Sequence, residues 1–201
     1  MRIGVYGGTF NPPHIGHLIL AEEVRERLSL DKVLWVLTPV PPHKPSLGII
    51  DAAFRCRMVQ LTIAGNPDFS LSTVEINREP PHYAVDTMKL LKESYPEDTL
   101  VYLMGKDSLR DLPSWHHPEE FVKLCDYIAV MERAEVSVSM DDLEKKLTGI
   151  RERTVLVDTP LIAVSSSMIR ERIASGRTVR YLLPERVYEL IRENRFYQKG
   201  K

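Results

Sequence analysis

The sequence predicts an α/β protein with a Rossmann-like, open and mostly parallel sheet that carries helices on both faces. Short apolar runs of strand length alternate with stretches of helical spacing, an order that implies β-α-β units. Residues 33–37 and 100–104 are apolar throughout, as is typical of strands buried on both faces of a parallel sheet. The 201 residues contain no repeat or linker. We therefore expect one domain over 1–201, with a small helical part from about 165 to 201.

The overall charge excludes some classes of protein. The chain has 27 basic and 28 acidic residues, a net charge of −1, which argues against nucleic acid or an anionic membrane surface as a partner. No apolar run reaches the ~18 residues of a membrane span, and the first residues lack the apolar core of a signal peptide. We expect a cytoplasmic protein in which Cys56 and Cys125 are reduced, buried thiols.

The first elements follow from local patterns. Residues 3–6 read as a short apolar strand, and 16–28 repeat apolar residues at helical spacing. The next strand is 33–37, where we expect Trp35 in the core. Four prolines then occur between 38 and 45, which excludes a helix or a central strand there.

The middle of the chain continues the alternation. A helix is expected over 51–63, and 72–76 alternate apolar and polar residues like a strand. A second helix covers 83–94 and stops before Pro96, and the next strand is 100–104. We expect the loop histidines at 43, 82, 116 and 117 to lie at the surface.

The last third predicts two strands, 127–131 and 154–157, on either side of a peripheral polar helix at 141–148. A helix with a serine-rich start covers 165–174. Pro184 opens the final helix, which ends near Arg192.

The strongest functional signal is Gly-Gly-Thr-Phe-Asn-Pro-Pro-His-Ile-Gly-His, residues 7–17. It follows the first strand and opens the first helix, and ligands of open α/β sheets bind at the carboxyl ends of strands. Paired glycines allow close approach of the backbone, and a helix N-terminus offers N–H groups to an anion. The spacing matches neither GxGxxG nor GxxxxGK(S/T), so we expect a phosphate site of another kind.

His14 and His17 are three residues apart, so they can face the same side as the helix begins. Imidazoles in that position suit hydrogen bonds to phosphate oxygens and stabilisation of charge developing at phosphorus. There are three other interpretations. They are a metal pair, for which a third ligand at helical spacing is missing, a helix cap with incidental histidines, and a dinucleotide-binding turn, which the glycine spacing disfavours. We favour the phosphate interpretation.

A second signal is Ser165-Ser166-Ser167, followed one turn later by Arg170. A serine at a helix N-terminus is an ordinary cap, which explains one of the three. Three hydroxyls, free backbone N–H groups and a guanidinium also form a phosphate cradle. Spacing alone leaves both interpretations open.

The two segments resemble those of the nucleotidyltransferase superfamily that has an H-x-G-H motif. The first is similar to its G-G-T-F-(D/N)-P-x-H-x-G-H, and the second to its (I/V)-S-S-(T/S)-x-I-R. Within the superfamily, P-P-H-K at 41–44 and the G-x-D-S-L and L-P-x-W stretches within 105–115 resemble the bacterial nicotinate-nucleotide adenylyltransferase family. The H-x-G-H pair specifies only the superfamily, whereas the other stretches specify the branch. The resemblance runs from residue 1 to about 195.

The resemblance implies a single nucleotidyltransferase domain that transfers the adenylyl group of ATP to nicotinate mononucleotide in NAD biosynthesis. The products would be nicotinate adenine dinucleotide and pyrophosphate. Mg²⁺ would come with ATP and not from a dedicated protein metal site. The implied ATP-binding residues are Gly7, Gly8, Thr9, Phe10, Asn11, His14, His17, Gly105, Asp107, Ser165, Ser166, Ser167 and Arg170. The implied catalytic residues are His14, His17, Lys44 and Arg170.

Roles within that set are also implied. The backbone of 7–10 would lie against ATP, and His17 would be nearest the α-phosphate. Asp107 would bind ribose hydroxyls, and Ser166 would lie near the adenylyl end. The implied mononucleotide-binding residues are Lys44, Tyr83, Ala84, Trp115 and Arg133, with the Trp115 indole stacked on the pyridine ring.

The chain departs from the family pattern at four places. Asn11 stands where aspartate is commoner, Ser167 replaces threonine, and Ala84 replaces a threonine that is credited with contacting the nicotinate. Arg133 is not followed by the usual Pro-Gly. The acid or amide preference of the mononucleotide pocket is therefore not specified by the sequence.

Alternative functions come from two classes. One is another H-x-G-H nucleotidyltransferase, such as a pantetheine-phosphate adenylyltransferase, a cytidylyltransferase or an enzyme that prefers nicotinamide mononucleotide. The other is a nucleotide-binding regulator without catalysis, which would lack a histidine of the pair or the arginine after the serines; neither is missing. A homo-oligomer is compatible with the sequence, which does not specify the oligomeric state.

Overall fold

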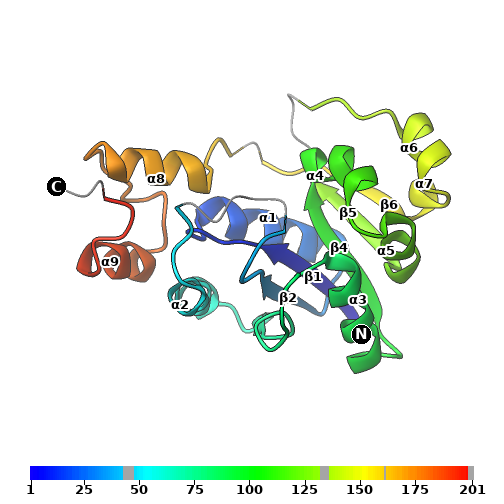
Figure 1. Cartoon of the computed structure of the whole chain (residues 1–201), viewed down its shortest axis with the longest axis horizontal. Coiled ribbons are helices and arrows are strands. Elements are labelled where there is room, and N and C mark those ends of the chain that lie inside the picture. The colour runs from blue at the N-terminus through cyan, green and yellow to red at the C-terminus, as the bar shows by residue number, and fades with distance from the viewer. Residues whose placement is uncertain (43–47, 132–135, 161, 199–201) are drawn as a thin grey trace.

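The computed structural model describes residues 1–42, 48–131, 136–160 and 162–198. Within these ranges, six strands form one sheet in the order β3-β2-β1-β4-β5-β6, and all neighbouring strands are parallel. The strands are β1 (Arg2–Gly8), β2 (Lys32–Leu37), β3 (Phe69–Ser72), β4 (Thr99–Gly105), β5 (Tyr127–Met131) and β6 (Thr154–Val157). The prediction of an open, parallel α/β sheet is confirmed (Figure 1).

The strand order creates a switch point next to β1. The chain builds outward from β1 to β2 and β3, and then returns to place β4 on the other side of β1. In register, Val5 of β1 pairs with Leu34 of β2 and with Tyr102 of β4. The connections leave β1 and β4 in opposite directions. In open parallel sheets, ligands bind at the carboxyl ends of the strands at such a switch point.

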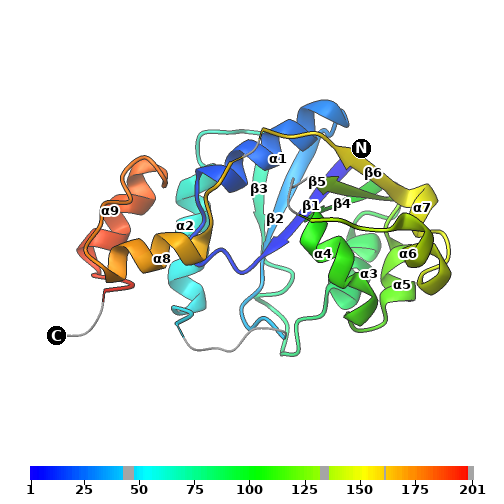
Figure 2. The ribbon, with the colours of Figure 1, turned by 90° about the horizontal axis from the view of Figure 1, so that it is seen from above.

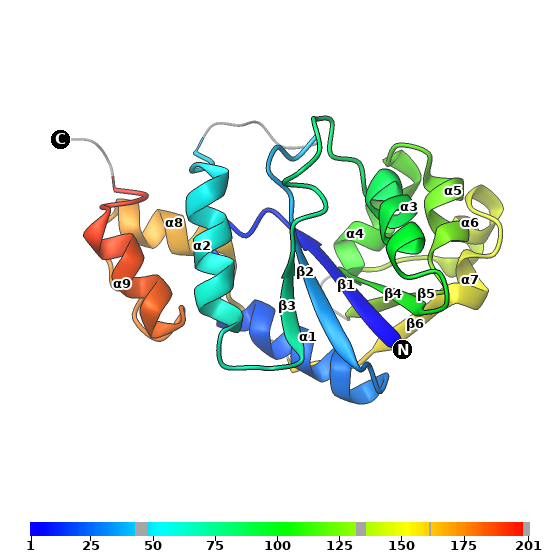
Figure 3. The same cartoon turned by 90° about the horizontal axis from the view of Figure 1, so that it is seen from below.

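Helices cover both faces of the sheet, and the last two helices lie beyond them, next to α2 (Figure 3). In the described ranges the helices are α1 (Ile15–Arg27), α2 (Ala52–Ile63), α3 (Ala84–Ser94), α4 (Lys106–Asp111), α5 (Pro118–Leu124), α6 (Met140–Lys146), α7 (Ile150–Arg153), α8 (Ser166–Ala174) and α9 (Glu185–Glu193), with a 3₁₀ turn at Leu112–Ser114. Val24 of α1 and Val59 of α2 share one buried cluster with Trp35, which is fully buried as expected. Met88 of α3 and Phe121 of α5 belong to the cluster on the other face.

The carboxyl-terminal helices form a third apolar cluster with α2. Ile169 of α8 and Val187 of α9 are buried together with Met58 of α2. After β6, the chain returns across α1 to reach α8 (Figure 2). This return brings the serine-rich segment back to the beginning of the chain.

The structure corrects several expectations. Residues 72–76 are not a strand: β3 ends at Ser72, and the Asn77 N–H donates to the Thr73 carbonyl at 3.0 Å to close a turn. The cause is local, because the Thr73 hydroxyl also accepts from the Asn77 side chain at 3.2 Å. The sequence patterns also gave no sign of α4, α7 or the 3₁₀ turn, which are too short for a hydrophobic period.

Two further expectations concern single side chains. His82 is buried at 4% exposure, although we expected it at the surface, and desolvation together with the nearby Arg78 lowers its pKa. His116 and His117 are exposed, as expected. Cys125 is buried and Cys56 only half-buried, and both are free thiols.

Candidate active site

Three segments with predicted site residues are brought to the carboxyl ends of β1 and β4. The loop after β1 carries residues 9–14. Gly105 ends β4, which pairs with β1, and Asp107 follows it at the start of α4. The start of α8 is joined to that loop, because the Ser166 hydroxyl donates to the Pro12 carbonyl at 2.8 Å. Two motifs that are distant in the sequence therefore share one region of the structure.

The loop after β1 is fixed by Phe10. This residue has a left-handed backbone, with φ of +45°, and its ring is 3% exposed. The ring packs on Trp35 at 5.2 Å and edge-on to Tyr6 at 5.7 Å between centroids. A Cβ on Gly8 would lie 2.9 Å from this ring. The Phe10 side chain thus faces the core, and the backbone of residues 7–10 is what the loop offers to a ligand.

The two histidines are stacked at the start of α1. Their ring centroids are 3.7 Å apart, His14 is 5% exposed, and His17 is half-buried. Gly16 permits this arrangement, since a Cβ there would lie 3.0 Å from Nδ1 of His14. The edge-on contact of His17 with Phe10, at 5.1 Å, holds the second ring.

A backbone hydrogen bond sets the proton position on His17. The His14 N–H donates to Nδ1 of His17 at 3.1 Å. A neutral imidazole that accepts at Nδ1 carries its proton on Nε2. His17 is therefore arranged to donate from Nε2, which is the form that an anionic oxygen needs.

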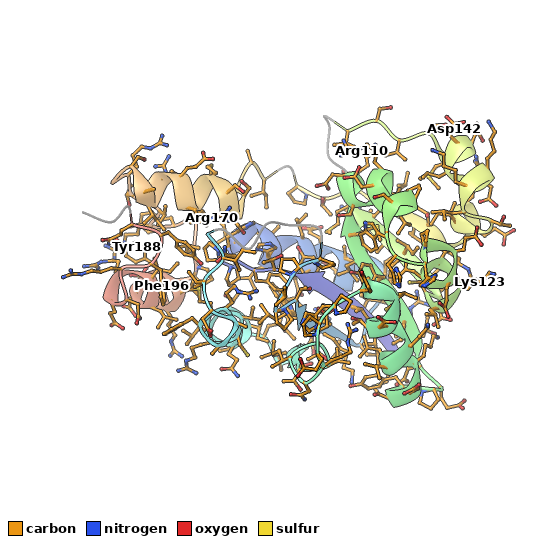
Figure 4. The ribbon with its side chains drawn as sticks, in the orientation of Figure 1. Arg110, Lys123, Asp142, Arg170, Tyr188 and Phe196 are labelled. Carbon is orange, nitrogen blue, oxygen red and sulfur yellow. The ribbon has the colours of Figure 1, made fainter. Side chains whose placement is uncertain are left out.

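The start of α8 combines a cap with a bridge to the loop. The Ser165 hydroxyl accepts from the Met168 N–H at 3.2 Å, so this serine is the N-cap. Arg170 donates through Nη1 to the Asn11 carbonyl at 2.8 Å and through Nη2 to the Ser167 hydroxyl at 3.3 Å. Arg170 lies on the side of α8 that faces the amino-terminal segment (Figure 4). The first of the two open interpretations of the serines thus accounts for Ser165. Ser166 bonds to the loop after β1, and Ser167 bonds to Arg170 of its own helix.

Of the predicted mononucleotide residues, Tyr83 and Ala84 lie at the start of α3, and Trp115 follows the 3₁₀ turn. Tyr83 is the N-cap residue of α3, and its ring stacks on His116 at 4.0 Å with 25° between the planes. Trp115 is half-buried and packs against Phe121 at 5.3 Å and edge-on to Tyr102 at 6.3 Å. A Cβ on Gly7 would lie 2.7 Å from the Tyr102 hydroxyl. Tyr102 therefore bridges the Trp115 region and the glycines of β1.

Some predicted site residues have other surroundings. Lys44 and Arg133 lie outside the described residues. The Asn11 side chain is 4% exposed and is used by protein partners, because Nδ2 donates to the Gly48 carbonyl at 2.9 Å. Asp107 and Ala84 are half-buried near the start of their helices.

Arg55 is a site-shaping residue that the sequence interpretation missed. It is 1% exposed, and its guanidinium donates to the carbonyls of Thr9, Thr38, Pro39 and Ile50 at 2.6–2.9 Å. It thereby ties the loop after β1 to the loop after β2. Burial lowers its pKa. The available signal was its position on the inner face of α2, at helical spacing from Met58, Val59 and Thr62.

Within the described ranges, no three His, Cys, Asp or Glu side chains gather as metal ligands. Nor does any described helix combine the length and apolar character needed to cross a membrane.

Comparison with known proteins identifies the class and then the family. Residues 5–172 match the family described as Cytidylyltransferase-like, so fold and site define a nucleotidyltransferase of this class. A probable nicotinate-nucleotide adenylyltransferase of Thermomicrobium roseum is 42% identical over 98% of this chain and 92% of its own. A probable nicotinate-nucleotide adenylyltransferase of Dehalococcoides mccartyi is 40% identical over 99% of this chain and 98% of its own. The chain belongs to the nicotinate-nucleotide adenylyltransferase family.

Solved structures agree with the fold. The Plasmodium falciparum nicotinic acid mononucleotide adenylyltransferase complexed with NaAD superimposes with a TM-score of 0.80. The match covers 98% of this chain and 97% of that one, at 19% identity. The layer order and sheet topology are therefore shared across the whole chain.

Proposed function

We propose that this chain transfers the adenylyl group of ATP to nicotinate mononucleotide, forming nicotinate adenine dinucleotide and pyrophosphate. The observation that carries the proposal is the pair of hydrogen bonds from α8 to the loop after β1, Ser166 to Pro12 and Arg170 to Asn11. They join the serine helix to the loop that holds the stacked imidazoles, so hydroxyls, a guanidinium and ring N–H groups share one region. The names of the relatives support the acceptor.

The proposed step is a single displacement. An oxygen of the acceptor's 5′-phosphate attacks the α-phosphorus of ATP in line. The bond from this phosphorus to the α–β bridging oxygen breaks, and pyrophosphate leaves with the electron pair. The attacking oxygen is already anionic, so the step needs neither a protein nucleophile nor a general base. The protein supplies position and offsets charge, as in phosphoryl transfer generally.

The main obstacle is repulsion between two polyanions. The N–H on Nε2 of His17 suits a non-bridging oxygen of the α-phosphate, where negative charge increases in the transition state. The N-terminus of α8 offers backbone N–H groups and the positive end of its dipole to the phosphate tail. Two of the five N–H donors of Arg170 are used by Asn11 and Ser167, which leaves others for phosphate.

Mg²⁺ enters this proposal as part of the substrate, Mg-ATP. The described residues gather no set of three acidic or histidine ligands, so the oxygens that suit the ion are those of the phosphates and water. The ion would offset charge on the departing pyrophosphate.

The proposal is tested by measuring pyrophosphate release and dinucleotide formation with ATP and each of three acceptors. These are nicotinate mononucleotide, nicotinamide mononucleotide and 4′-phosphopantetheine. We expect the highest kcat/KM with nicotinate mononucleotide, and a dinucleotide product whose mass is that of nicotinate adenine dinucleotide. A higher kcat/KM with either other acceptor, or no product with any, would overturn the assignment.

A further inference from the structure

The carboxyl-terminal segment reaches the loop after β1. The Tyr197 hydroxyl donates to Oδ1 of Asn11 at 2.8 Å. The two residues are 186 positions apart in the chain, and Asn11 lies between the glycines and the histidines of the predicted ATP-binding motif. The contact therefore links the end of the chain to the phosphate loop.

Asn11 connects two further segments, residues 48–50 and α8. Its Nδ2 donates to the Gly48 carbonyl at 2.9 Å, and its Oδ1 also accepts from the Ile50 N–H at 3.4 Å. Its own carbonyl accepts from Arg170 of α8 at 2.8 Å. With 4% exposure, the Asn11 side chain has no bulk water to replace a lost partner. The orientation of one amide thus depends on the loop that ends at residue 50 and on the docked Tyr197.

Residues 195–198 leave α9 through a left-handed turn. Arg195, with φ of +53°, ends the helix in the usual way: its N–H donates to the Arg192 carbonyl, and the Phe196 N–H donates to the Ile191 carbonyl. Tyr197 is also left-handed, with φ of +64°, which is disfavoured for residues other than glycine. Between them, Phe196 packs edge-on to Phe54 of α2 with ring centroids 4.7 Å apart. The Phe196 packing and the Tyr197 hydrogen bond therefore hold residues 196 and 197 against α2 and the loop after β1.

We propose that Tyr197 is a positioning residue of the ATP-phosphate site: its hydroxyl holds the Asn11 amide, and through it the loop after β1, in the geometry that binds the triphosphate. The inference rests on the proposed function for the identity of the ligand. The phenol remains a donor at neutral pH, because burial raises the pKa of Tyr197 despite the nearby Arg170 and Arg55 guanidiniums.

The physical consequence is a change in the population of the binding-competent loop. When only a fraction of the molecules hold the loop correctly, the apparent Kd rises by the inverse of that fraction. Loss of one net hydrogen bond corresponds to about a fivefold change in such an equilibrium. A purely structural anchor would instead lower stability and leave the affinity of the folded protein unchanged.

The test is Tyr197→Phe, which removes only the hydroxyl. Isothermal calorimetry measures the Kd of an Mg-ATP analogue that has a methylene bridge between the α- and β-phosphorus atoms. We expect a higher Kd than for the unchanged protein, by up to about fivefold, while the KM for the mononucleotide stays the same. Hydrogen exchange adds a second readout: the Ile50 amide should lose protection.

Tyr188→Phe is the matched control. Tyr188 lies on α9 in the same part of the chain, and its ring contacts with Arg180 and Arg192 survive the change. We expect its Kd to equal that of the unchanged protein. Tyr197→Phe should also have little further effect in an Asn11→Ala background, since the two act through one bond.

An unchanged Kd in Tyr197→Phe would overturn the inference, whether or not the melting temperature falls. If Tyr197→Phe raises the Kd by the same factor in the Asn11→Ala background as in the unchanged protein, Tyr197 does not act through Asn11. The binding readout needs no turnover. A protein that binds the analogue through Tyr197 but forms no dinucleotide would therefore contradict the proposed function and leave this inference standing.

Discussion

A single charged side chain, Arg55, shapes a site that it does not enter. Its guanidinium donates to carbonyls of the loops after β1 and β2. We expect Arg55→Met to lower the free energy of unfolding by about 3 kcal/mol, because several buried carbonyls lose their donor. Urea denaturation measures the change. The control is Arg57→Met on the exposed face of the same helix, and equal effects of the two substitutions would contradict the account.

Glu75 links one side chain to the pH dependence of stability. It is 4% exposed and accepts from the Thr87 hydroxyl at 2.6 Å. Burial raises its pKa above the usual 4.5, although the contacts with Thr87, Thr38 and Arg78 oppose this. The unfolded chain thus releases the proton first, and the carboxyl's contribution to stability declines as pH rises from about 4.5 through its folded pKa.

We therefore expect Glu75→Gln to gain stability relative to the unchanged protein as pH rises through that window. Urea denaturation at a series of pH values from 4 to 8 measures the difference, and the neutral amide keeps Oε1 as the acceptor for Thr87. A difference that is constant with pH, or that changes in the opposite direction, would show that the Glu75 pKa is not raised in the folded protein.

His17 is the residue whose chemistry the proposed step uses most directly. Its Nδ1 is committed to the His14 N–H, so removal of the ring removes the donor at Nε2. We expect His17→Ala to lower kcat about 10²-fold, which corresponds to ~3 kcal/mol in the barrier, with a much smaller change in KM. Steady-state kinetics with His117→Asn as an exposed-histidine control provide the measurement. Near-normal turnover would remove His17 from the mechanism.

At the level of elements, two helices with serine caps allow the effect of a lost cap on stability to be measured apart from an effect on ligand binding. Ser165 caps α8 and Ser139 caps α6 with the same 3.2 Å contact from a backbone N–H. We expect Ser165→Ala and Ser139→Ala each to cost about 1 kcal/mol of stability. Only Ser165→Ala should also weaken binding of Mg-ATP, which calorimetry measures. Equal ATP affinity in both variants would mean that Ser165 is a cap alone.

The helices and strands also differ in how well local sequence patterns predict them. Strands such as 33–37 and 100–104 were predictable because burial on both faces makes them apolar at every position. The error at 72–76 arose because alternating polarity also suits a turn with local side-chain hydrogen bonds: the Ser72 hydroxyl accepts from the Val74 N–H, and the Thr73 hydroxyl accepts from the Asn77 side chain. α7 has four residues, fewer than a period needs.

For the whole molecule, the features that could not be predicted from the sequence are those that depend on tertiary contacts. The two motifs were recognisable by resemblance, but their meeting depends on the return of the chain after β6 and on bonds that span over 150 positions. The roles of Arg55 and Tyr197 are invisible locally, because their partners are backbone carbonyls and an amide in distant loops. The partners of the Asn11 side chain, in residues 48–50 and at Tyr197, are likewise distant in the sequence.

The claim on which the whole account depends is that the adenylyl group passes directly from ATP to the acceptor, with the imidazoles as donors. The most direct measurement uses ATP made chiral by sulfur at the α-phosphorus, with nicotinate mononucleotide as acceptor, and determines the configuration in the dinucleotide. A single in-line displacement predicts inversion. Retention would require two displacements and a protein-bound adenylyl group, and would contradict the account.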